Sequence, residues 1–411
     1  MSTNVASSAP SYDLKKGQLF NLLLITFASA VGFWAWTIIG PLAKFYASPE
    51  QMNLDANQTS LLVAMPIFIG AIGRIPAGGL TDRFGGRIMM SAVLFIAAPL
   101  VLLVGVAGMA KSFTMMLIVA FFLGIAGTVF AIGIPFSSAW YDASKKGFAT
   151  GVFGAGMVGT AVSAFFTPRL KESIGYFPTH IFVAALCVVF AVLCLAFLRD
   201  SPATKGREPK PLLPGIKLAF KQVSTWQLCF LYAVLFGAFV AFSNYLPTYL
   251  VNVYAKAIAD AGVMAAGFAV AAVITRPFGG VLADKFGPKI VTLVALGGVT
   301  VLALVLAFVN PEGEHVYGPI FIAMAGLLGL GSGSVFGWVG RAADPNNVGA
   351  TSGVIAAAGA LGGFFPPLVM GATYNAEHNN YMIGLTLLAI TAGLAFLLAF
   401  VVKHGEKPQH A

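Results

Sequence analysis

The stretch Arg74-Ile-Pro-Ala-Gly-Gly-Leu-Thr-Asp-Arg-Phe-Gly-Gly-Arg87 returns, with changes, as Arg276-Pro-Phe-Gly-Gly-Val-Leu-Ala-Asp-Lys-Phe-Gly-Pro-Lys289. The two copies are 202 residues apart, which is about half of the 411-residue chain. A shorter pair keeps the same offset, with Gly147-Phe-Ala-Thr-Gly151 matching Gly349-Ala-Thr-Ser-Gly353. The repeat therefore predicts two structurally related halves.

The composition around this repeat is that of a membrane protein. Hydrophobic residue types make up 58% of the chain and charged types 9%, whereas a typical soluble domain carries about 25% charged residues. So few charges cannot cover the surface of a soluble protein of this size. The composition excludes a soluble enzyme, a nucleic-acid binder and a disordered chain, and it leaves a polytopic membrane protein.

The number of spans follows from the lengths of the apolar runs. A membrane-spanning helix needs about 20 mostly apolar residues, and helices are one of only two structures that satisfy backbone hydrogen bonds in lipid. We place twelve spans near residues 18–43, 59–81, 88–110, 113–139, 147–170, 178–198, 218–251, 258–282, 289–309, 316–340, 348–374 and 380–402. The predicted fold is all-α, with twelve transmembrane helices in two pseudo-symmetric six-helix bundles.

A polar, proline-rich stretch after the sixth span is typical of a linker. It divides the chain into a tail (1–17), a first bundle (18–198), a linker (199–217), a second bundle (218–402) and a second tail (403–411). Of the 24 Lys and Arg residues, two fall inside predicted spans. When both tails and the linker are placed on one side of the membrane, seventeen of the others lie on that same side. The five on the other side are Lys44, Lys111, Arg169, Lys171 and Lys256. The positive-inside rule predicts that both termini are cytoplasmic.

The two basic residues inside spans are Arg74 and Arg276. Each precedes by eight residues the aspartate that ends its span, Asp82 or Asp284, which is about 12 Å along a helix. In a hydrocarbon core about 30 Å thick, that position is close to the midplane. An arginine there costs at least ~2.5–3.5 kcal/mol on insertion scales.

No acidic partner for these arginines is visible, because all 15 Asp and Glu and all five His lie in tails, loops or span ends. Two permanent cations without a counter-ion predict a binding site for an anion, and the planar fork of a guanidinium suits a planar oxyanion. The alternative is a structural role, with both arginines bonded to backbone carbonyls. Proton symport through a mid-span carboxylate is not expected. Anion exchange, or proton coupling through a loop group or the substrate, stays open.

The repeated stretch resembles the loop motif of the major facilitator superfamily, and the resemblance covers length, span number, linker and both loops. In that superfamily the loop latches the cytoplasmic ends of the two halves. The resemblance therefore implies a latch role for five residues, Asp82, Arg83, Arg87, Asp284 and Lys285. It also implies the major facilitator fold, with a substrate site near mid-membrane between the halves.

Spans five and eleven are rich in glycine, and small residues let helices pack closely and slide. With one arginine in each of spans two and eight, they resemble the nitrate/nitrite porter family within the superfamily. That resemblance implies transport of nitrate and nitrite, with the anion bound by Arg74 and Arg276. It implies a conformational role for Gly154, Gly156, Gly159, Gly359, Gly362 and Gly363.

The resemblance extends to aromatic residues that would line the site. Tyr232 and Phe236 match the family's Tyr-x-x-x-Phe in span seven and share a helix face at i and i+4. Phe130 and Phe336 are weaker matches, and these two could instead pack or face lipid.

The chain departs from the family pattern at three positions. The family often has asparagines there, and this chain has Val129, Met157 and Ser332. These changes remove hydrogen-bonding groups, so the preference among nitrate, nitrite and another small anion stays open.

The sequence thus predicts a secondary transporter of nitrate or nitrite that works by alternating access in the cell (inner) membrane. We expect a monomer without cofactor, metal site or nucleic-acid partner, and no enzymatic activity. Two rival predictions remain: a transporter of another small anion, such as cyanate or a carboxylate, and a membrane sensor that binds an anion without transporting it.

Overall fold

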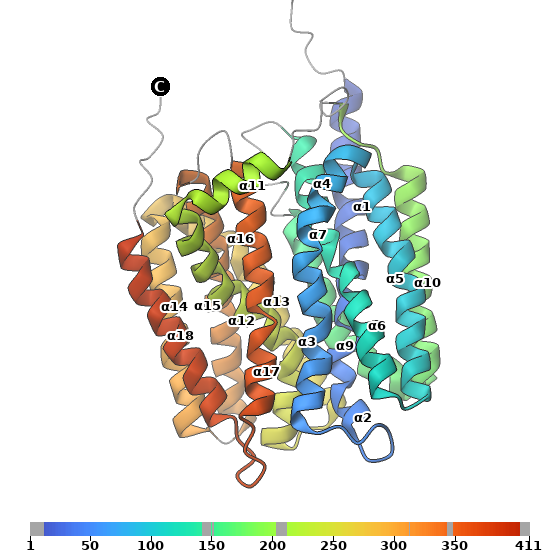
Figure 1. The fold of residues 1–411 in the computed structure, drawn as a ribbon, viewed down its shortest axis with the longest axis vertical. Helices are drawn as coiled ribbons and strands as arrows, with labels where there is room; N and C mark the ends of the chain where they lie inside the picture. The colour runs from blue at the N-terminus through green and yellow to red at the C-terminus, as the bar shows by residue number, and fades with distance from the viewer. Residues whose placement is uncertain are drawn as a thin grey trace, which may run out of the picture.

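The computed structural model describes residues 12–141, 149, 152–202, 212–311, 313–342 and 348–402. Most of both predicted tails, the first residues of the fifth span and part of the linker lie outside these residues. Within them the regular structure is helical apart from one isolated bridge between Asn375 and Asn380. The helices form two groups, one for each half of the chain (Figure 1).

The first half has six helical segments, several of them broken into shorter helices. The elements are α1 (Tyr12–Thr37), η1 (Gly40–Leu42), α2 (Ala43–Ala47), α3 (Ala56–Ile72), α4 (Arg74–Phe84), α5 (Gly86–Met109), α6 (Phe113–Leu123), η2 (Gly124–Thr128), α7 (Val129–Ala139), η4 (Ala155–Val158), α9 (Gly159–Ile174) and α10 (Tyr176–Phe197). The pair α5 and α10 forms one wall of this half.

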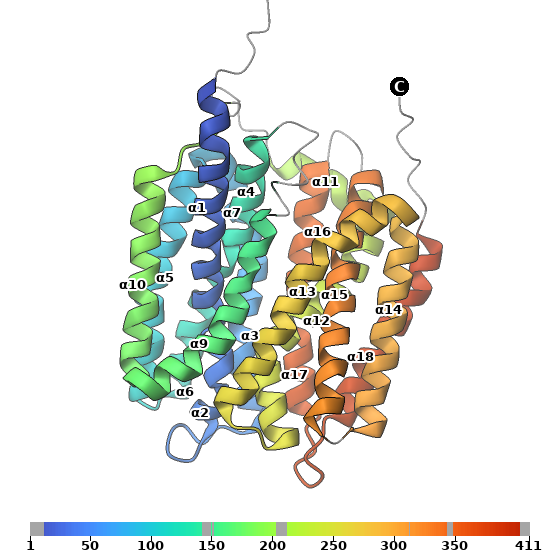
Figure 2. The same cartoon turned by 180° about the vertical axis from the view of Figure 1, so that it is seen from behind.

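The second half repeats the arrangement. Its elements are α12 (Val223–Tyr254), α13 (Ile258–Phe286), α14 (Pro288–Leu304) with a π-helical turn η6 (Val305–Val309), α15 (Glu314–Ala342), α16 (Val348–Gly362), α17 (Phe365–Ala372) and α18 (Met382–Val401). Helix α13 packs closely on α15, and α14 packs on α15 and α18. In Figure 2 this half is yellow to red, beside the blue and green first half.

Eleven helical segments of the described residues are long and apolar enough to cross a membrane. The remaining predicted span, 147–170, begins outside the described residues and continues as η4 and α9, which pack against α1 and α13. The prediction of an all-helical, multi-pass fold in two bundles is confirmed.

The repeat seen in the sequence is also a repeat of structure. Helix α4 ends at Phe84 and α13 ends at Phe286, again 202 residues apart. The next residue in each case is a glycine with positive φ, +84° at Gly85 and +89° at Gly287. Glycine adopts this backbone conformation without the steric cost that a Cβ would add. The same sharp joint therefore connects the second and third spans of both halves.

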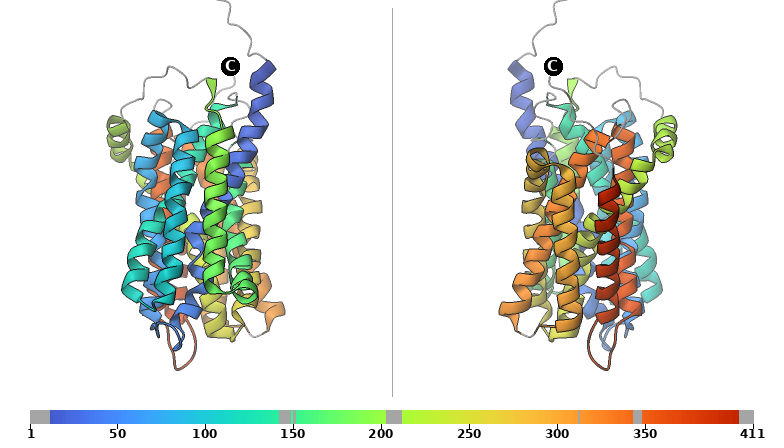
Figure 3. Two further views of the ribbon diagram at one scale, coloured as in Figure 1. Left: turned by 90° about the vertical axis from the view of Figure 1, so that its right-hand side faces the viewer. Right: turned by 90° about the vertical axis from the view of Figure 1, so that its left-hand side faces the viewer.

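One element differs from the sequence prediction. The seventh span is not continuous from residue 218, because Gln222 has an extended backbone (φ −86°, ψ 123°) that separates α11 (Leu212–Lys221) from α12. Helix α11 lies crosswise at the end of the molecule where α1 begins (Figure 1), and Figure 3 shows it end-on at the side of the bundle. A helix thus occupies the last residues of the predicted linker.

The two halves meet most closely at one end of the molecule. We call the end where α1 begins and α18 ends the tail end, and the opposite end, where α2 lies, the loop end (Figure 1). Helix α3 packs on α17, and α9 packs on α13. Near the loop end the hydroxyls of Ser60 and Tyr245 lie 3.0 Å apart, and a Cβ on Gly262 would meet the carbonyl oxygen of Ala164 at 2.3 Å.

Candidate substrate site between the two halves

Arg74 is the first residue of α4, directly after the joint with α3 at Gly73. Among the described side chains it is the only Lys, Arg, Asp or Glu that is fully buried, with 4% exposure. Its Nη1 donates to the carbonyl oxygen of Ala356, on α16 of the other half, at a long 3.4 Å. Its Nε and Nη2 are buried and have no hydrogen-bond partner within the part of the chain that the structure describes.

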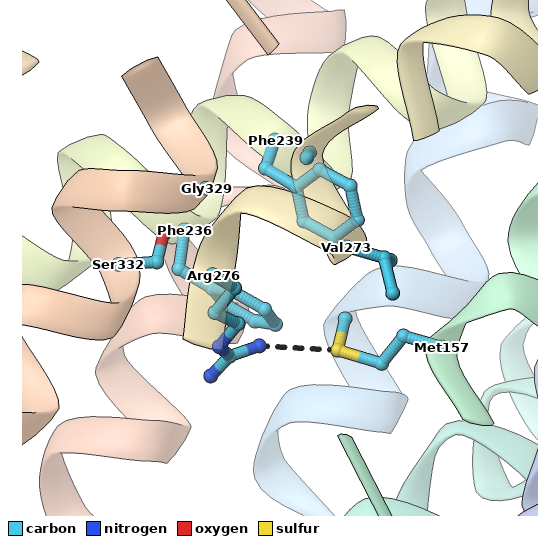
Figure 4. Close-up of a pocket in the computed structure, with 8 residues that line it drawn as sticks. Met157, Phe236, Phe239, Val273, Arg276, Gly329 and Ser332 are labelled. Carbon is cyan, nitrogen blue, oxygen red and sulfur yellow. Dashed lines mark hydrogen bonds between the residues drawn. The ribbon is translucent and has the colours of Figure 1, made fainter. Parts of the chain in front are cut away.

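Arg276 lies on α13 and is partly exposed. Its Nη2 donates to the hydroxyl oxygen of Tyr232 on α12 at 2.5 Å. Its Nη1 donates to the sulfur of Met157, in η4 of the first half, at 3.1 Å (Figure 4). Each arginine therefore reaches a partner in the opposite half of the molecule.

Two phenylalanine rings lie beside both guanidinium groups. The Cζ of Arg74 is 5.2 Å from the ring centre of Phe130 and 5.8 Å from that of Phe236. The Cζ of Arg276 is 5.5 Å and 5.0 Å from the same two ring centres. A cation within about 6 Å of an aromatic face gains an electrostatic attraction. The rings bring the two arginines into one site and partly offset their burial.

The remaining predicted aromatics complete this wall. The rings of Tyr232 and Phe236 stack at 4.9 Å with an interplanar angle of 3°, as expected for i and i+4 on one helix face. Phe336 meets Tyr232 edge to face at 4.8 Å, and its ring centre is 5.8 Å from the Cζ of Arg276. The structure thus brings together all six residues that the sequence predicts for the substrate site.

A small pocket opens beside Arg276, as the close-up in Figure 4 shows. Its lining residues are Met157, Phe236, Phe239, Ala272, Val273, Arg276, Gly329 and Ser332. The hydroxyl of Ser332 is used within its own helix, where it donates to the carbonyl oxygen of Leu328 at 2.6 Å. Most of the lining is apolar, so the arginine is the group that can recognise a ligand there.

The electrostatics of the site favour an anion. Two guanidinium groups near shared aromatic rings repel one another, and repulsion is stronger in a low-dielectric interior than in water. Charges inside proteins are normally paired, yet the hydrogen-bond partners that the structure describes for these two arginines are a carbonyl, a phenol and a thioether. A bound anion would offset the charge of both arginines at once.

Comparison with known proteins identifies the family. The family model of the Major Facilitator Superfamily matches residues 25–367 and, in a second match, residues 256–410. The probable nitrate/nitrite transporter NarK2 of Mycobacterium tuberculosis is 49% identical over 96% of this chain and 98% of its own length. The chain belongs to the nitrate/nitrite porter family of the major facilitator superfamily.

Two further similarities are informative. The porter is 34% identical to the nitrite extrusion protein of Bacillus subtilis, over 95% of this chain and 96% of that relative. A crystal structure of a bacterial homologue of the human lysosomal transporter Spinster covers 96% of this chain, with a TM-score of 0.73 and 16% sequence identity. The structural likeness shows the fold, and the sequence relatives show the family.

The glycines predicted for span five of the porter differ in their surroundings. A Cβ on Gly156 would lie 2.0 Å from Oγ of Ser29, and one on Gly159 would lie 2.0 Å from the carbonyl oxygen of Ala30. A Cβ on Gly154 would meet nothing within 4 Å. Gly156 and Gly159 therefore permit the close approach of this segment to α1, and Gly154 does not contribute to it.

The glycines of span eleven face α12. A Cβ on Gly359 would lie 2.1 Å from Cδ1 of Tyr232, and one on Gly362 would lie 2.2 Å from the carbonyl oxygen of Ala233. For Gly363 the nearest atom is Cβ of Val240 at 2.9 Å. The absence of side chains here lets α16 support the aromatic wall of the site directly.

Among the predicted latch residues, Arg87 has partners in its own half. Its Nε donates to the carbonyl oxygen of Leu195 at 2.8 Å, and its backbone N–H donates to a carboxylate oxygen of Asp200 at 3.3 Å. A Cβ on Gly85 would lie 2.5 Å from that carboxylate. These contacts fix the joint between α4 and α5 against the end of α10.

The other predicted latch residues lie at the tail end of α4 and α13. Arg83 is exposed, with its Cζ 5.4 Å from the ring centre of Phe84. Asp284 and Lys285 are exposed as well. The side chain of Asp82 lies outside the described ones. A role in holding the halves together stays a prediction for all five residues.

Some residues of the site were not expected from the sequence. Phe239 lies three residues beyond Phe236 on the same helix face, so helical periodicity could have indicated it. The carbonyl of Ala356 could not have been found, because any residue of α16 offers the same group. The sequence marks Met157 only as a departure from the family pattern, and no feature of the sequence predicts its contact with Arg276.

Proposed function

We propose that this porter moves nitrate and nitrite across the cell (inner) membrane by alternating access, with the anion held between Arg74 and Arg276. The observation that carries the proposal is that two buried donors on Arg74 have no hydrogen-bond partner among the described residues. Leaving a buried donor unsatisfied costs about 1–3 kcal/mol, and more when the group is charged. An oxyanion supplies the missing acceptors and the missing negative charge together.

The shape and chemistry of the site support a small planar oxyanion. A guanidinium forms two parallel hydrogen bonds to two oxygens of a planar group, and the stacked rings of Tyr232 and Phe236 provide a flat wall. The apolar pocket lining offers little that could replace a strong hydration shell. An ion that loses water easily is therefore favoured over a strongly hydrated one.

The contacts between the halves support alternating access. The closest packing described above joins the halves near the loop end, through Ser60 and Tyr245 and through Gly262 and Ala164. Rocking of two repeat-related bundles about a central site would open this end and close the other. The positive-inside rule puts the tail end in the cytoplasm, and the structure would then correspond to a state closed toward the outside.

The test is anion flux in liposomes that contain the purified full chain. Arg74→Lys and Arg276→Lys keep the charge but lose the planar fork, and we expect each to lower nitrate exchange at sub-saturating nitrate by at least about tenfold. Arg169→Lys, on a partly exposed arginine of α9 outside the pocket lining, is the matched control and should transport normally.

Three results would change the proposal. Normal nitrate exchange by both lysine variants would refute the arginine clamp. A wild-type protein that binds nitrate without moving it would be a sensor and not a transporter. Stronger inhibition of uptake by cyanate or a carboxylate than by unlabelled nitrate would show that another small anion is the substrate.

A further inference from the structure

The contact between Met157 and Arg276 is an unusual one for a guanidinium group. The sulfur of Met157 accepts from Nη1 at 3.1 Å, and the side chain is 1% exposed. Figure 4 shows the thioether pointing across the pocket at the guanidinium, from the opposite half of the molecule. The other terminal nitrogen of Arg276 has an oxygen partner, the hydroxyl of Tyr232.

A thioether is a weak acceptor, whereas a bond from a guanidinium to an anionic oxygen is charge-assisted and roughly twice as strong as a neutral one. An anion that enters the site therefore competes successfully for Nη1. The same anion displaces the hydroxyl of Tyr232 from Nη2 less easily, because the tyrosine ring is fully buried and stacked on Phe236.

The backbone that carries Met157 is held in place by α1, and its buried side chain borders the pocket that it lines. The flanking Gly156 and Gly159 lie so close to α1 that a Cβ on either would be 2.0 Å from an α1 oxygen. The methionine side chain is unbranched and has three rotatable bonds. Displacement of the sulfur thus needs a rotamer change and no movement of η4.

From these observations we propose that Met157 is a positioning residue that acts as a displaceable acceptor for Arg276. In the empty site its sulfur holds Nη1 in the pocket; on binding, an anion oxygen takes that place and the sulfur turns away. Because the acceptor is weak, it orients the arginine at a smaller cost to anion affinity than a stronger acceptor would impose. This inference deepens the proposed function and rests on it.

The experiment compares two variants of similar side-chain length in the purified full chain. Met157→Leu removes the acceptor, and Met157→Gln replaces it with an amide oxygen, which is a stronger acceptor. We expect the dissociation constant for nitrate, measured by isothermal titration calorimetry, to fall about two- to tenfold in the leucine variant and to rise at least about fivefold in the glutamine variant. Met116→Leu, on a buried methionine outside the pocket lining, is the control for the substitution itself and should bind nitrate as the wild type does.

A purely structural role of Met157 would not change the dissociation constant in opposite directions in the leucine and glutamine variants. If both variants weaken nitrate binding, as a packing defect would, the inference is wrong while the proposed function stands. If the glutamine variant does not fold, the leucine variant decides alone, and a rise in its dissociation constant of more than twofold overturns the inference. A wild-type chain that binds neither nitrate nor nitrite would refute the proposed function and this inference with it.

Discussion

Gly359→Ala is a small change with a large expected effect on the site. Gly359 lies on α16 against the ring of Tyr232, and an alanine Cβ there would be 2.1 Å from Cδ1 and 2.4 Å from Cε1 of that ring. The same Cβ would be 3.2 Å from Cδ1 of Phe236. Since carbon atoms in contact lie about 3.5–4.0 Å apart, the tyrosine ring would have to move by more than 1 Å.

The magnitude follows from what holds the ring. Tyr232 is fully buried and stacked face to face on Phe236, so it cannot move without disturbing the aromatic wall. Overpacking of a well-packed interior costs about 1–3 kcal/mol. Helix propensity works in the other direction, since alanine is favoured over glycine by up to about 1 kcal/mol. The steric term exceeds the propensity term, so we expect a less stable protein.

The effect on binding comes from the bond between Arg276 and Tyr232. The hydroxyl oxygen of Tyr232 accepts from Nη2 at 2.5 Å, and a hydrogen bond to a charged group contributes about 1.5–3 kcal/mol. A ring displaced by more than 1 Å loses most of that bond. We expect the dissociation constant for nitrate to rise by at least about tenfold, since 1.4 kcal/mol corresponds to a factor of ten.

The assay is nitrate binding by calorimetry together with the thermal midpoint of the anion-free protein. Gly154→Ala is the matched control, because it is a glycine of the same predicted class whose Cβ would meet nothing within 4 Å. It should bind nitrate normally and unfold at an unchanged or slightly higher temperature. Normal nitrate binding by Gly359→Ala, or equal damage from Gly154→Ala, would show that the close contact with Tyr232 is not what makes Gly359 important.

Three other perturbations give distinct expectations. Tyr232→Phe removes the hydroxyl but keeps the stack, so it should weaken nitrate binding about tenfold in calorimetry with little change in thermal midpoint. Gly371→Ala would put a Cβ 2.0 Å from Oγ of Ser60, and spin-label distances across the loop end should lengthen. Glu314 raises the pKa of the partly exposed Lys256 through the hydrogen bond that it accepts. The small stabilisation should therefore be full below about pH 10.4 and lost as the pH rises through the raised pKa, and Glu314→Gln should lower the thermal midpoint slightly only below that pH.

The sequence was sufficient for the architecture because the membrane limits the possible structures. Long apolar runs must be helices in lipid, and the repeat of Arg74 to Arg87 relates the two halves in the sequence itself. The two arginines could be singled out from the sequence, because an arginine far from any interface is costly and therefore conspicuous, whereas the four aromatics came from the resemblance to the porter family. In the structure, Arg74, Arg276 and their four aromatic neighbours all lie in one place.

The details that the sequence could not supply depend on contacts between distant segments. The partners of the arginines are the carbonyl of Ala356 and the sulfur of Met157, which lie 282 and 119 residues away. Neither group has a sequence signature, since every residue has a carbonyl and methionine is common in apolar helices. The helix α11 was missed for a different reason: its apolar residues run directly into those of α12, and only the extended backbone of Gln222 separates the two.

Each arginine contacts the opposite half of the molecule, and these contacts indicate how an anion could drive transport. Arg74 of the first half contacts α16 of the second, and Arg276 of the second half contacts η4 of the first. Both cross-contacts are weak, one long and the other to a sulfur. A ligand can shift a conformational equilibrium only by its difference in affinity between the states. An anion that replaces both weak contacts with charge-assisted bonds gains the most binding free energy in the conformation in which the two arginines lie close together. It therefore favours the state in which the halves close around it.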